Sequence, residues 1–181
     1  GVNWFMMYNF VPTGRGTEMV EADLEPNQRE ELLQMLWEQM KTRKINILST
    51  APQFSRIAQQ YESAKIERGS GEIVGTECNV TVVPTHFFNP SLPGNLRRLA
   101  DFIGGCGAGR FYLSLEPNGD IYPCVFFPRD EKVKLGNIKT VNFEDMWRNS
   151  PLLRKLRNKD ELKSKCGSCT FRYTCGGCRA R

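Results

Sequence analysis

The sequence has a single histidine, no long apolar run and no segment typical of a secretory signal. His86 stands beside Phe87 and Phe88, and we interpret it as a loop residue rather than a catalytic base or a metal ligand. No apolar run approaches the roughly 20 residues of a membrane-spanning helix, which predicts a soluble protein without a membrane partner. Because seven cysteines occur without secretory features, we expect a reducing compartment, the cytoplasm.

Positive charge is concentrated at one end of the chain. The 181 residues carry a net charge of +5, and 40% are apolar and 25% charged, as in ordinary globular proteins. Residues 148–181 hold ten Lys or Arg against only Asp160 and Glu161, a net charge of +8. Such a tail could bind nucleic acid. We favour a local role, in which these residues offset the thiolates of a metal site, and do not expect a nucleic-acid partner.

Four of the seven cysteines lie within the last sixteen residues, with two, five and two residues between Cys166, Cys169, Cys175 and Cys178. Thiolates packed this closely repel one another unless a cation or an oxidised bond holds them. Disulfides are the weakest interpretation because the number of cysteines is odd. Zinc ribbons usually separate their cysteine pairs by roughly 15–20 residues, and the five-residue gap of this tail also departs from the bacterial ferredoxin gaps of two, two and three. The spacing alone therefore leaves zinc and iron–sulfur open.

The N-terminal part of the sequence predicts alternating strands and helices. Its first segment is apolar without alternation, which predicts a strand buried on both faces, as in a parallel sheet. The clearest helix begins at Pro26, with acidic residues early and basic residues late, and we expect Met35 and Trp37 in its core face. The predicted elements are strands at Val2–Phe10 and Ile45–Ser49, helices at Pro26–Lys44 and Pro52–Tyr61, and a βα loop at Val11–Gly16.

Glycine and proline punctuate residues 68–95, which predicts a connection between two units. We expect a short strand at Val80–Val83 and a short helix at Asn95–Ile103. Cys78 lies in this connection, far in sequence from the other six cysteines, and we interpret it as a small buried apolar residue.

A β-hairpin is predicted next. Gly119 can adopt the positive φ that the three-residue loop Pro117–Gly119 demands. The hairpin would fix the position of Cys124 relative to Cys106. Its predicted strands are Phe111–Glu116 and Asp120–Cys124.

A helix should follow the hairpin. The side chain of Asn142 can cap its N-terminus, and Pro151 should break or kink it.

Taken together, the cysteines follow the order Cys106-x12-Gly119-x4-Cys124, a gap of 41 residues, and then Cys-x2-Cys-x5-Cys-x2-Cys. This pattern resembles the SPASM domain, the C-terminal auxiliary-cluster module of many radical SAM enzymes. The strings GGCGAGRFY, PNGDIYPC, LGNI, FEDMW and CGGCRAR agree with that family, and CGGCRAR is similar to its haem-biosynthesis members, the alternative haem and denitrifier-haem groups. The resemblance covers residues 104–181 and favours iron–sulfur over zinc.

The resemblance implies two auxiliary 4Fe-4S clusters. The family's last cysteine has no counterpart before Arg181, and the third spacing of the tail is two residues where the family usually has three. Each cluster is therefore left without an assigned fourth protein ligand. Carried over by position, Cys106, Cys124 and Cys178 would ligate the first cluster, and Cys166, Cys169 and Cys175 the second.

The first 65 or so residues resemble the closing strands and helices of the radical SAM partial (β/α)6 barrel, on the strings FVPTGRG and TAPQFSRIA. The expected fold class is thus α/β, with α+β character. We expect residues 1–95 to hold the last part of that barrel and a connection. Residues 96–181 would form a small cysteine-rich SPASM domain, truncated at its C-terminus, with a β-hairpin and short helices.

The resemblance implies that the parent protein is a radical SAM oxidoreductase acting on a tetrapyrrole, at a haem-precursor side chain. It would use S-adenosylmethionine, a third 4Fe-4S cluster and an electron donor such as ferredoxin or flavodoxin. The catalytic Cys-x3-Cys-x2-Cys motif is absent from this sequence, so we do not expect this part to start radical chemistry itself. Two alternatives stay open: a radical SAM maturase that modifies a peptide or protein, and a non-catalytic zinc module that binds nucleic acid.

Overall fold

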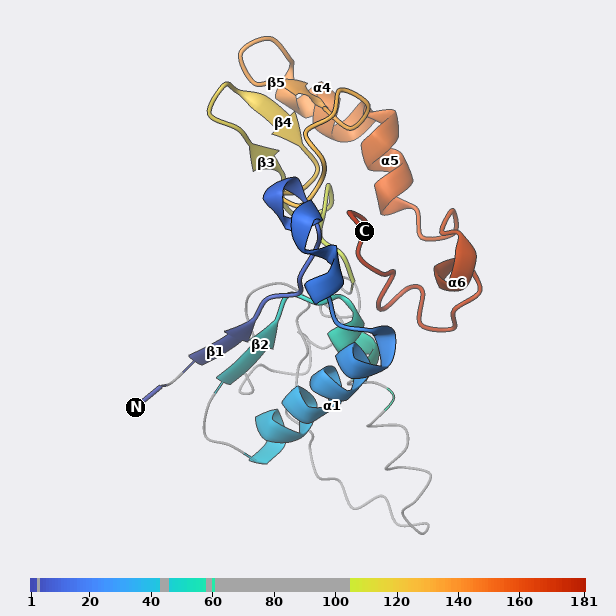
Figure 1. Cartoon of the computed structure of the whole chain (residues 1–181). Coiled ribbons are helices and arrows are strands. Elements are labelled where there is room, and N and C mark those ends of the chain that lie inside the picture. Colours follow the sequence, from blue (N-terminus) through green and yellow to red (C-terminus); the bar gives the residue numbers. More distant parts are fainter. Residues whose placement is uncertain (3, 43–45, 58–59, 61–104) are drawn as a thin grey trace. The chain divides into compact units, whose positions relative to one another are not determined.

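The computed structural model describes residues 1–2, 4–42, 46–57, 60 and 105–181 (Figure 1). The chain divides into two compact units, each with its own hydrophobic core. Unit 1 comprises Gly1–Asn9 and Leu24–Gly105, and unit 2 comprises Phe10–Asp23 and Cys106–Arg181. The predicted domain boundary between residues 95 and 96 lies outside the described residues and stays a prediction.

Unit 1 contains two parallel strands, as the sequence predicts. Strand β1 (Trp4–Met7) pairs with β2 (Asn46–Ser49), with Trp4 opposite Asn46 and Met7 opposite Ser49. The observed β1 is shorter than the predicted strand. The expectation that it is buried on both faces is wrong, because Phe5 is 46% exposed. Apolar composition alone does not reveal which face of a strand a neighbouring element covers.

Helix α1 (Pro26–Thr42) covers the core of unit 1 and begins at the predicted proline. Trp37 is 1% exposed and meets Phe54 edge-on, with ring centroids 6.2 Å apart. Met35 is 51% exposed, so its predicted place in the core is wrong. Residues 53–57 are helical, within the predicted second helix. The core consists of Leu33, Leu36, Trp37, Ile47, Ala51, Phe54 and Ile57.

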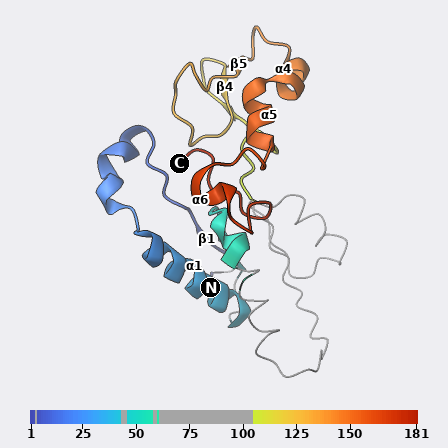
Figure 2. The ribbon, with the colours of Figure 1, turned by 90° about the vertical axis from the view of Figure 1, so that its right-hand side faces the viewer.

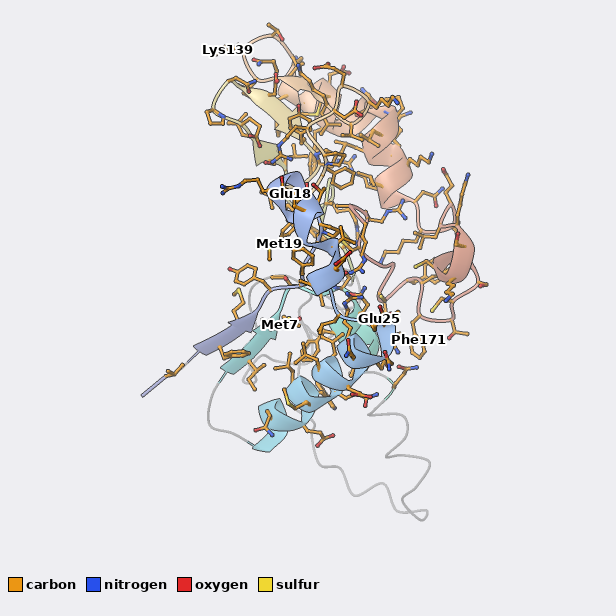
Figure 3. All side chains as sticks on the ribbon, in the orientation of Figure 1. Met7, Glu18, Met19, Glu25, Lys139 and Phe171 are labelled. Atoms are coloured by element: carbon orange, nitrogen blue, oxygen red, sulfur yellow. The ribbon has the colours of Figure 1, made fainter. Side chains whose placement is uncertain are left out.

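The first segment of unit 2 is the 3-10 helix η1 (Gly14–Ala22). The predicted plain loop at Val11–Gly16 is therefore wrong in its last three residues, which are helical. The Thr17 hydroxyl donates to the Gly14 carbonyl at 2.7 Å, and the Gly16 N–H donates to the Thr13 carbonyl at 2.9 Å, which supports the tight first turn. Met19 is 57% exposed, and its side chain is labelled in Figure 3.

The sheet of unit 2 contains the predicted hairpin and one further strand. Strands β3 (Ser114–Leu115) and β4 (Asp120–Tyr122) are antiparallel, and β5 (Gly136–Asn137) pairs antiparallel with β4. Gly119 adopts a φ of +97°, which confirms its predicted role in the loop. The strands are shorter than predicted. Strand β5 was not predicted, because two residues carry no alternating pattern.

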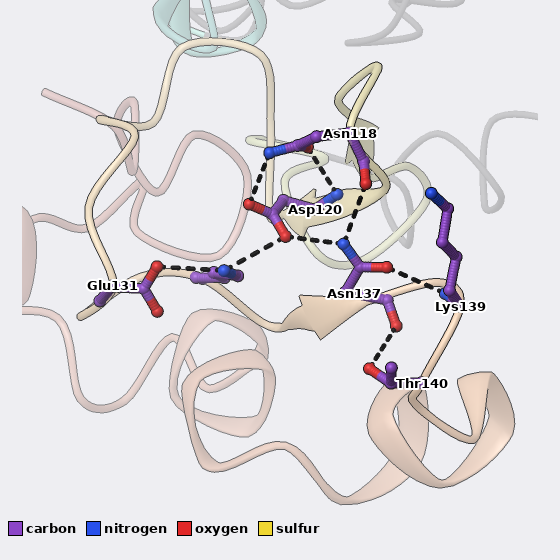
Figure 4. Close-up of polar contacts among 7 residues, drawn as sticks. Asn118, Asp120, Glu131, Asn137, Lys139 and Thr140 are labelled. Carbon is purple, nitrogen blue, oxygen red and sulfur yellow. Dashed lines mark hydrogen bonds and ion pairs between the residues drawn. The ribbon is translucent and has the colours of Figure 1, made fainter.

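Polar side chains link the hairpin loop to β5 (Figure 4). The Asn137 amide donates to Asp120 Oδ1 at 2.9 Å and to the Asn118 carbonyl at 3.1 Å. Lys134 Nζ lies 3.2 Å from Asp120 Oδ1. Hydrogen bonding from Asn137, followed by that from Lys134 and Asn118, holds the pKa of Asp120 below its usual value.

Helices α4 (Phe143–Asn149) and α5 (Pro151–Arg157) follow one another beside β4 and β5 (Figure 1, Figure 2), and α6 (Ser164–Gly167) comes later. The predicted cap is confirmed, since Asn142 Oδ1 accepts the Asp145 N–H at 3.0 Å. The break at Pro151 is confirmed too, with Ser150 capping the new helix. Both helices supply the core of unit 2, which contains Ala108, Ile121, Cys124, Phe127, Met146, Leu153 and Leu156.

The described residues thus mix helices and strands, as the α/β and α+β class predicts. None of the described helices is both long and apolar enough to cross a membrane. The predictions for Cys78, His86, Val80–Val83 and Asn95–Ile103 fall outside the described residues.

Candidate metal centre

Three cysteines from distant parts of unit 2 lie around one tyrosine. Cys124 follows β4 and is 3% exposed, and Cys106 packs against the same core. The Gly109 N–H donates to the Pro123 carbonyl at 3.0 Å, which ties the segment after Cys106 to the end of the hairpin. We name Cys106, Cys124 and Cys178 the first thiol group, because all three interact electrostatically with Tyr112.

The Tyr112 hydroxyl donates a hydrogen bond to Cys124 of this first thiol group. Burial raises the pKa of Tyr112, and the three thiols raise it further, so the phenol keeps its proton. Burial also raises the pKa of Cys124, and it raises the pKa of Cys178 to about 11. A bound metal ion reverses this tendency, because it deprotonates a coordinating thiol.

Backbone N–H groups point at three of the sulfurs. Phe126 donates to Cys124 Sγ and Gly177 donates to Cys175 Sγ, both at 3.4 Å. The Ala180 N–H donates to the Cys178 thiol. Hydrogen bonds of this kind favour the thiolate form, which is the form that binds metal, and they tune the potential of iron–sulfur clusters.

The remaining cysteines, Cys166, Cys169 and Cys175, form the second thiol group in and after α6. Gly177 lies between two of them: its N–H bonds Cys175, and a Cβ added to it would be 3.0 Å from Cys166 Sγ. Cys169 is held by the backbone, since its N–H donates to the Cys166 carbonyl at 3.4 Å. The structure therefore brings Cys166 and Cys175 together through Gly177 and places Cys169 in the adjoining turn.

Two basic side chains lie beside these thiols. Lys159 interacts electrostatically with both Cys175 and Cys106, and Arg110 interacts with Cys106. Burial lowers the pKa of Lys159 to about 8, and the neighbouring Arg110 lowers it too, while the two thiols oppose the shift. Lys159 is therefore still mostly protonated at neutral pH.

Only some basic residues of the tail at 148–181 interact with the thiols. Lys159 and Arg181 interact electrostatically with thiols, Arg181 with Cys178. Arg148 instead pairs with Glu144 on the surface of α4, at 2.8 Å. Several further basic residues of the tail, Arg154, Lys155, Lys163 and Lys165, are exposed.

The donor set suits a thiolate-bound metal. All six cysteines of the described residues are free thiols, so none is consumed by a disulfide. In the described part of the chain, no group of three or more His, Cys, Asp or Glu side chains is arranged to hold a metal ion, so the support for a metal is the chemistry of the donors. Soft thiolates with N–H bonds to sulfur are the donors that iron–sulfur clusters use.

The cysteine spacing did not predict which other side chains would lie near the sulfurs. Tyr112 lies in the string GGCGAGRFY, but nothing in that string indicates that its hydroxyl would reach Cys124. Lys159 belongs to a run of basic residues that are mostly exposed, and only its contacts distinguish it.

Part of the C-terminal half matches a known protein family. Residues 106–170 match SPASM, described as an iron-sulfur cluster-binding domain. Cys175 and Cys178 lie beyond the matched range. No solved structure matches the chain.

Curated relatives extend the similarity to the rest of the chain. An AdoMet-dependent heme synthase of Methanosarcina barkeri is 35% identical over 178 residues, 98% of this chain and 43% of the relative. One from Nitratidesulfovibrio vulgaris is 29% identical over 181 residues, 99% of this chain and 42% of the relative. A mycofactocin maturase of Mycobacterium ulcerans is 38% identical over 96 residues, 52% of this chain and 25% of the relative. The chain thus spans about two fifths of the length of these heme synthases.

Proposed function

We infer that the chain is the C-terminal region of a radical SAM oxidoreductase acting on a haem precursor, and that residues 106–170, which match SPASM, are an iron–sulfur cluster-binding domain. The observation that carries this proposal is the extent of the similarity. The heme synthases match 97–99% of the chain, including unit 1, whereas the mycofactocin maturase of Mycobacterium ulcerans matches 52%.

In this proposal each thiol group holds one auxiliary 4Fe-4S cluster. The first thiol group is supported by its convergence around Tyr112, and the second by the position of Gly177 between two sulfurs. When bound, such clusters accept and donate single electrons. The fourth ligand of each cluster would come from substrate, solvent or residues other than these six.

The residues of the chain would hold and shield the clusters. Phe126 and Gly177 orient sulfurs through their N–H groups, and the core around Cys124 excludes water on one side. Both effects shift the potential of a bound cluster.

Unit 1 would be the closing part of a (β/α)6 barrel. Its support is the parallel pairing of β1 with β2, together with α1 between them in sequence, which is the βαβ connection of such barrels. S-adenosylmethionine and the third 4Fe-4S cluster would bind elsewhere in the parent protein, because this sequence holds no Cys-x3-Cys-x2-Cys motif. Its partners would be a tetrapyrrole substrate and a ferredoxin- or flavodoxin-like electron donor.

A peptide-modifying maturase is the second candidate. It is favoured by the similarity of about half of the chain to mycofactocin maturases and to the antilisterial bacteriocin subtilosin biosynthesis protein of Bacillus subtilis, at 34% identity over 93 residues. Binding of a tetrapyrrole carrying propionates, but not of a peptide, would decide for the first candidate.

The test is iron and sulfide content after anaerobic reconstitution of the chain. We expect brown protein that contains iron and sulfide, and Cys124→Ala should lower both. Val125→Ala is the matched control, since Val125 is 56% exposed and adjacent. Hydrogen exchange should show α1 still protected in Cys124→Ala, because unit 1 has its own core. Colourless protein with stoichiometric zinc would overturn the proposal and revive the zinc module.

A further inference from the structure

Two segments that carry basic residues are joined at the end of α5. Arg157 Nε donates to the Gly109 carbonyl at 2.9 Å, and Arg157 Nη1 donates to the Trp147 carbonyl at 2.6 Å. Arg110 directly follows Gly109, and Lys159 follows Arg157 by two residues. The hydrogen bond at Gly109 therefore holds Arg110 and Lys159 near each other, consistent with their electrostatic interaction.

The side chain of Lys159 is also held against the loop that carries the second thiol group. Its Nζ donates to the Tyr173 carbonyl, two residues before Cys175. Its methylene carbons lie 3.8 and 4.0 Å from the place of a Cβ on Gly176, the residue after Cys175. The Lys159 side chain thus runs along the loop that carries Cys175.

These contacts place Lys159 beside the second thiol group, within electrostatic range of the first. It interacts with Cys175 of the second group and Cys106 of the first, whereas Arg110 interacts with Cys106. We propose that Lys159 and Arg110 form a cationic element shared by the two thiol groups, which stabilises the reduced form of a cluster bound at either. This inference rests on the proposed iron–sulfur function.

The physical reason is simple. One-electron reduction by a donor adds one negative charge to a cluster and changes none of its bonds to the protein. A fixed cation nearby lowers the free energy of the reduced form more than that of the oxidised form, and burial weakens screening by water. Lys159 would raise the potential at both sites, and Arg110 mainly at the first.

The experiment is a redox titration of the reconstituted full chain with dithionite, followed by electron paramagnetic resonance. Lys159→Gln should make reduction about tenfold less favourable, which corresponds to about 59 mV for a one-electron couple. Lys159→Arg should retain the wild-type potential, because it keeps the charge. Lys163→Gln is the control, since Lys163 is exposed.

Arg110→Gln is the second variant and should lower the potential of one cluster only. If Lys159→Gln keeps its iron and titrates like the wild type, the inference is wrong. If Lys159→Gln does not retain iron, Arg110→Gln decides, and an unchanged potential there overturns the inference. A wild-type chain that binds no iron would overturn the proposed function itself, which separates the two failures.

Discussion

Gly109 lies against Leu153 so closely that a Cβ on Gly109 would be 2.6 Å from Leu153 Cδ2. Gly109 also has a φ of +64° and connects, through its N–H and carbonyl, to the hairpin and to Arg157. It is thus the point at which the segment after Cys106 meets both α5 and the end of β4.

Gly109→Ala should destabilise unit 2. The added methyl group must displace Leu153, which is fully buried, and overpacking of this kind costs about 1–3 kcal/mol. Hydrogen exchange of α5 would measure the loss, with α1 in unit 1 as the internal reference. Unchanged protection of α5 would show that the core around Leu153 can shift without cost.

Gly177→Ala should weaken metal binding at the second thiol group, and the φ of +66° at Gly177 adds backbone strain to the substitution. A Cβ there would press on Cys166 Sγ at 3.0 Å, and changes beside a ligand typically cost roughly 10–100-fold in metal affinity. Iron retained after exposure to a chelator is the measurement. Gly14→Ala is the matched control, because Gly14 also has a positive φ, +54°, whereas a Cβ added to it would meet nothing within 4 Å. Equal iron retention in both variants would contradict the assignment.

Asn142→Ala should destabilise α4 by about 1 kcal/mol, because the Asp145 N–H loses its acceptor. Asn142→Gly should cost only a few tenths of a kcal/mol, since glycine is tolerated at this position. Chemical denaturation of the two variants, monitored by the fluorescence of Trp147 after Trp4 and Trp37 are replaced by Phe, separates the cap from a general effect of truncation. Identical midpoints would argue against the side-chain cap.

Asn137→Ala should raise the pKa of Asp120 towards the ordinary value of about 3.9, because Asn137 contributes the largest stabilisation of the carboxylate. A carboxyl whose folded pKa is lowered stabilises the fold above its unfolded pKa, and this contribution is lost as the pH falls through the folded pKa. The relevant window lies below about pH 4. Carbon NMR titration of the Asp120 carboxyl measures the shift. Lys139→Ala, which retains the backbone N–H that bonds Asn137, should leave it unchanged.

The features that the sequence predicted correctly are those that depend on neighbouring residues. The start of α1 at Pro26, the cap at Asn142 and the positive φ of Gly119 each depend on a few neighbouring residues. The exposure of Phe5 and Met35 was misjudged, because it depends on which elements cover them. The cysteine spacing indicated the family whose model matches residues 106–170, but it could not indicate Tyr112 or Lys159, whose interactions with the cysteines join segments distant in the sequence.

The ion pair between Arg181 and Asp23 joins residues 158 positions apart within unit 2. Anyone who excises residues 96–181 as a stand-alone fragment would therefore discard Phe10–Asp23, a piece of the same folded body. To keep the ion pair in an isolated unit 2, the segment Phe10–Asp23 must be retained, either by circular permutation of the gene or by co-expression of that segment as a peptide.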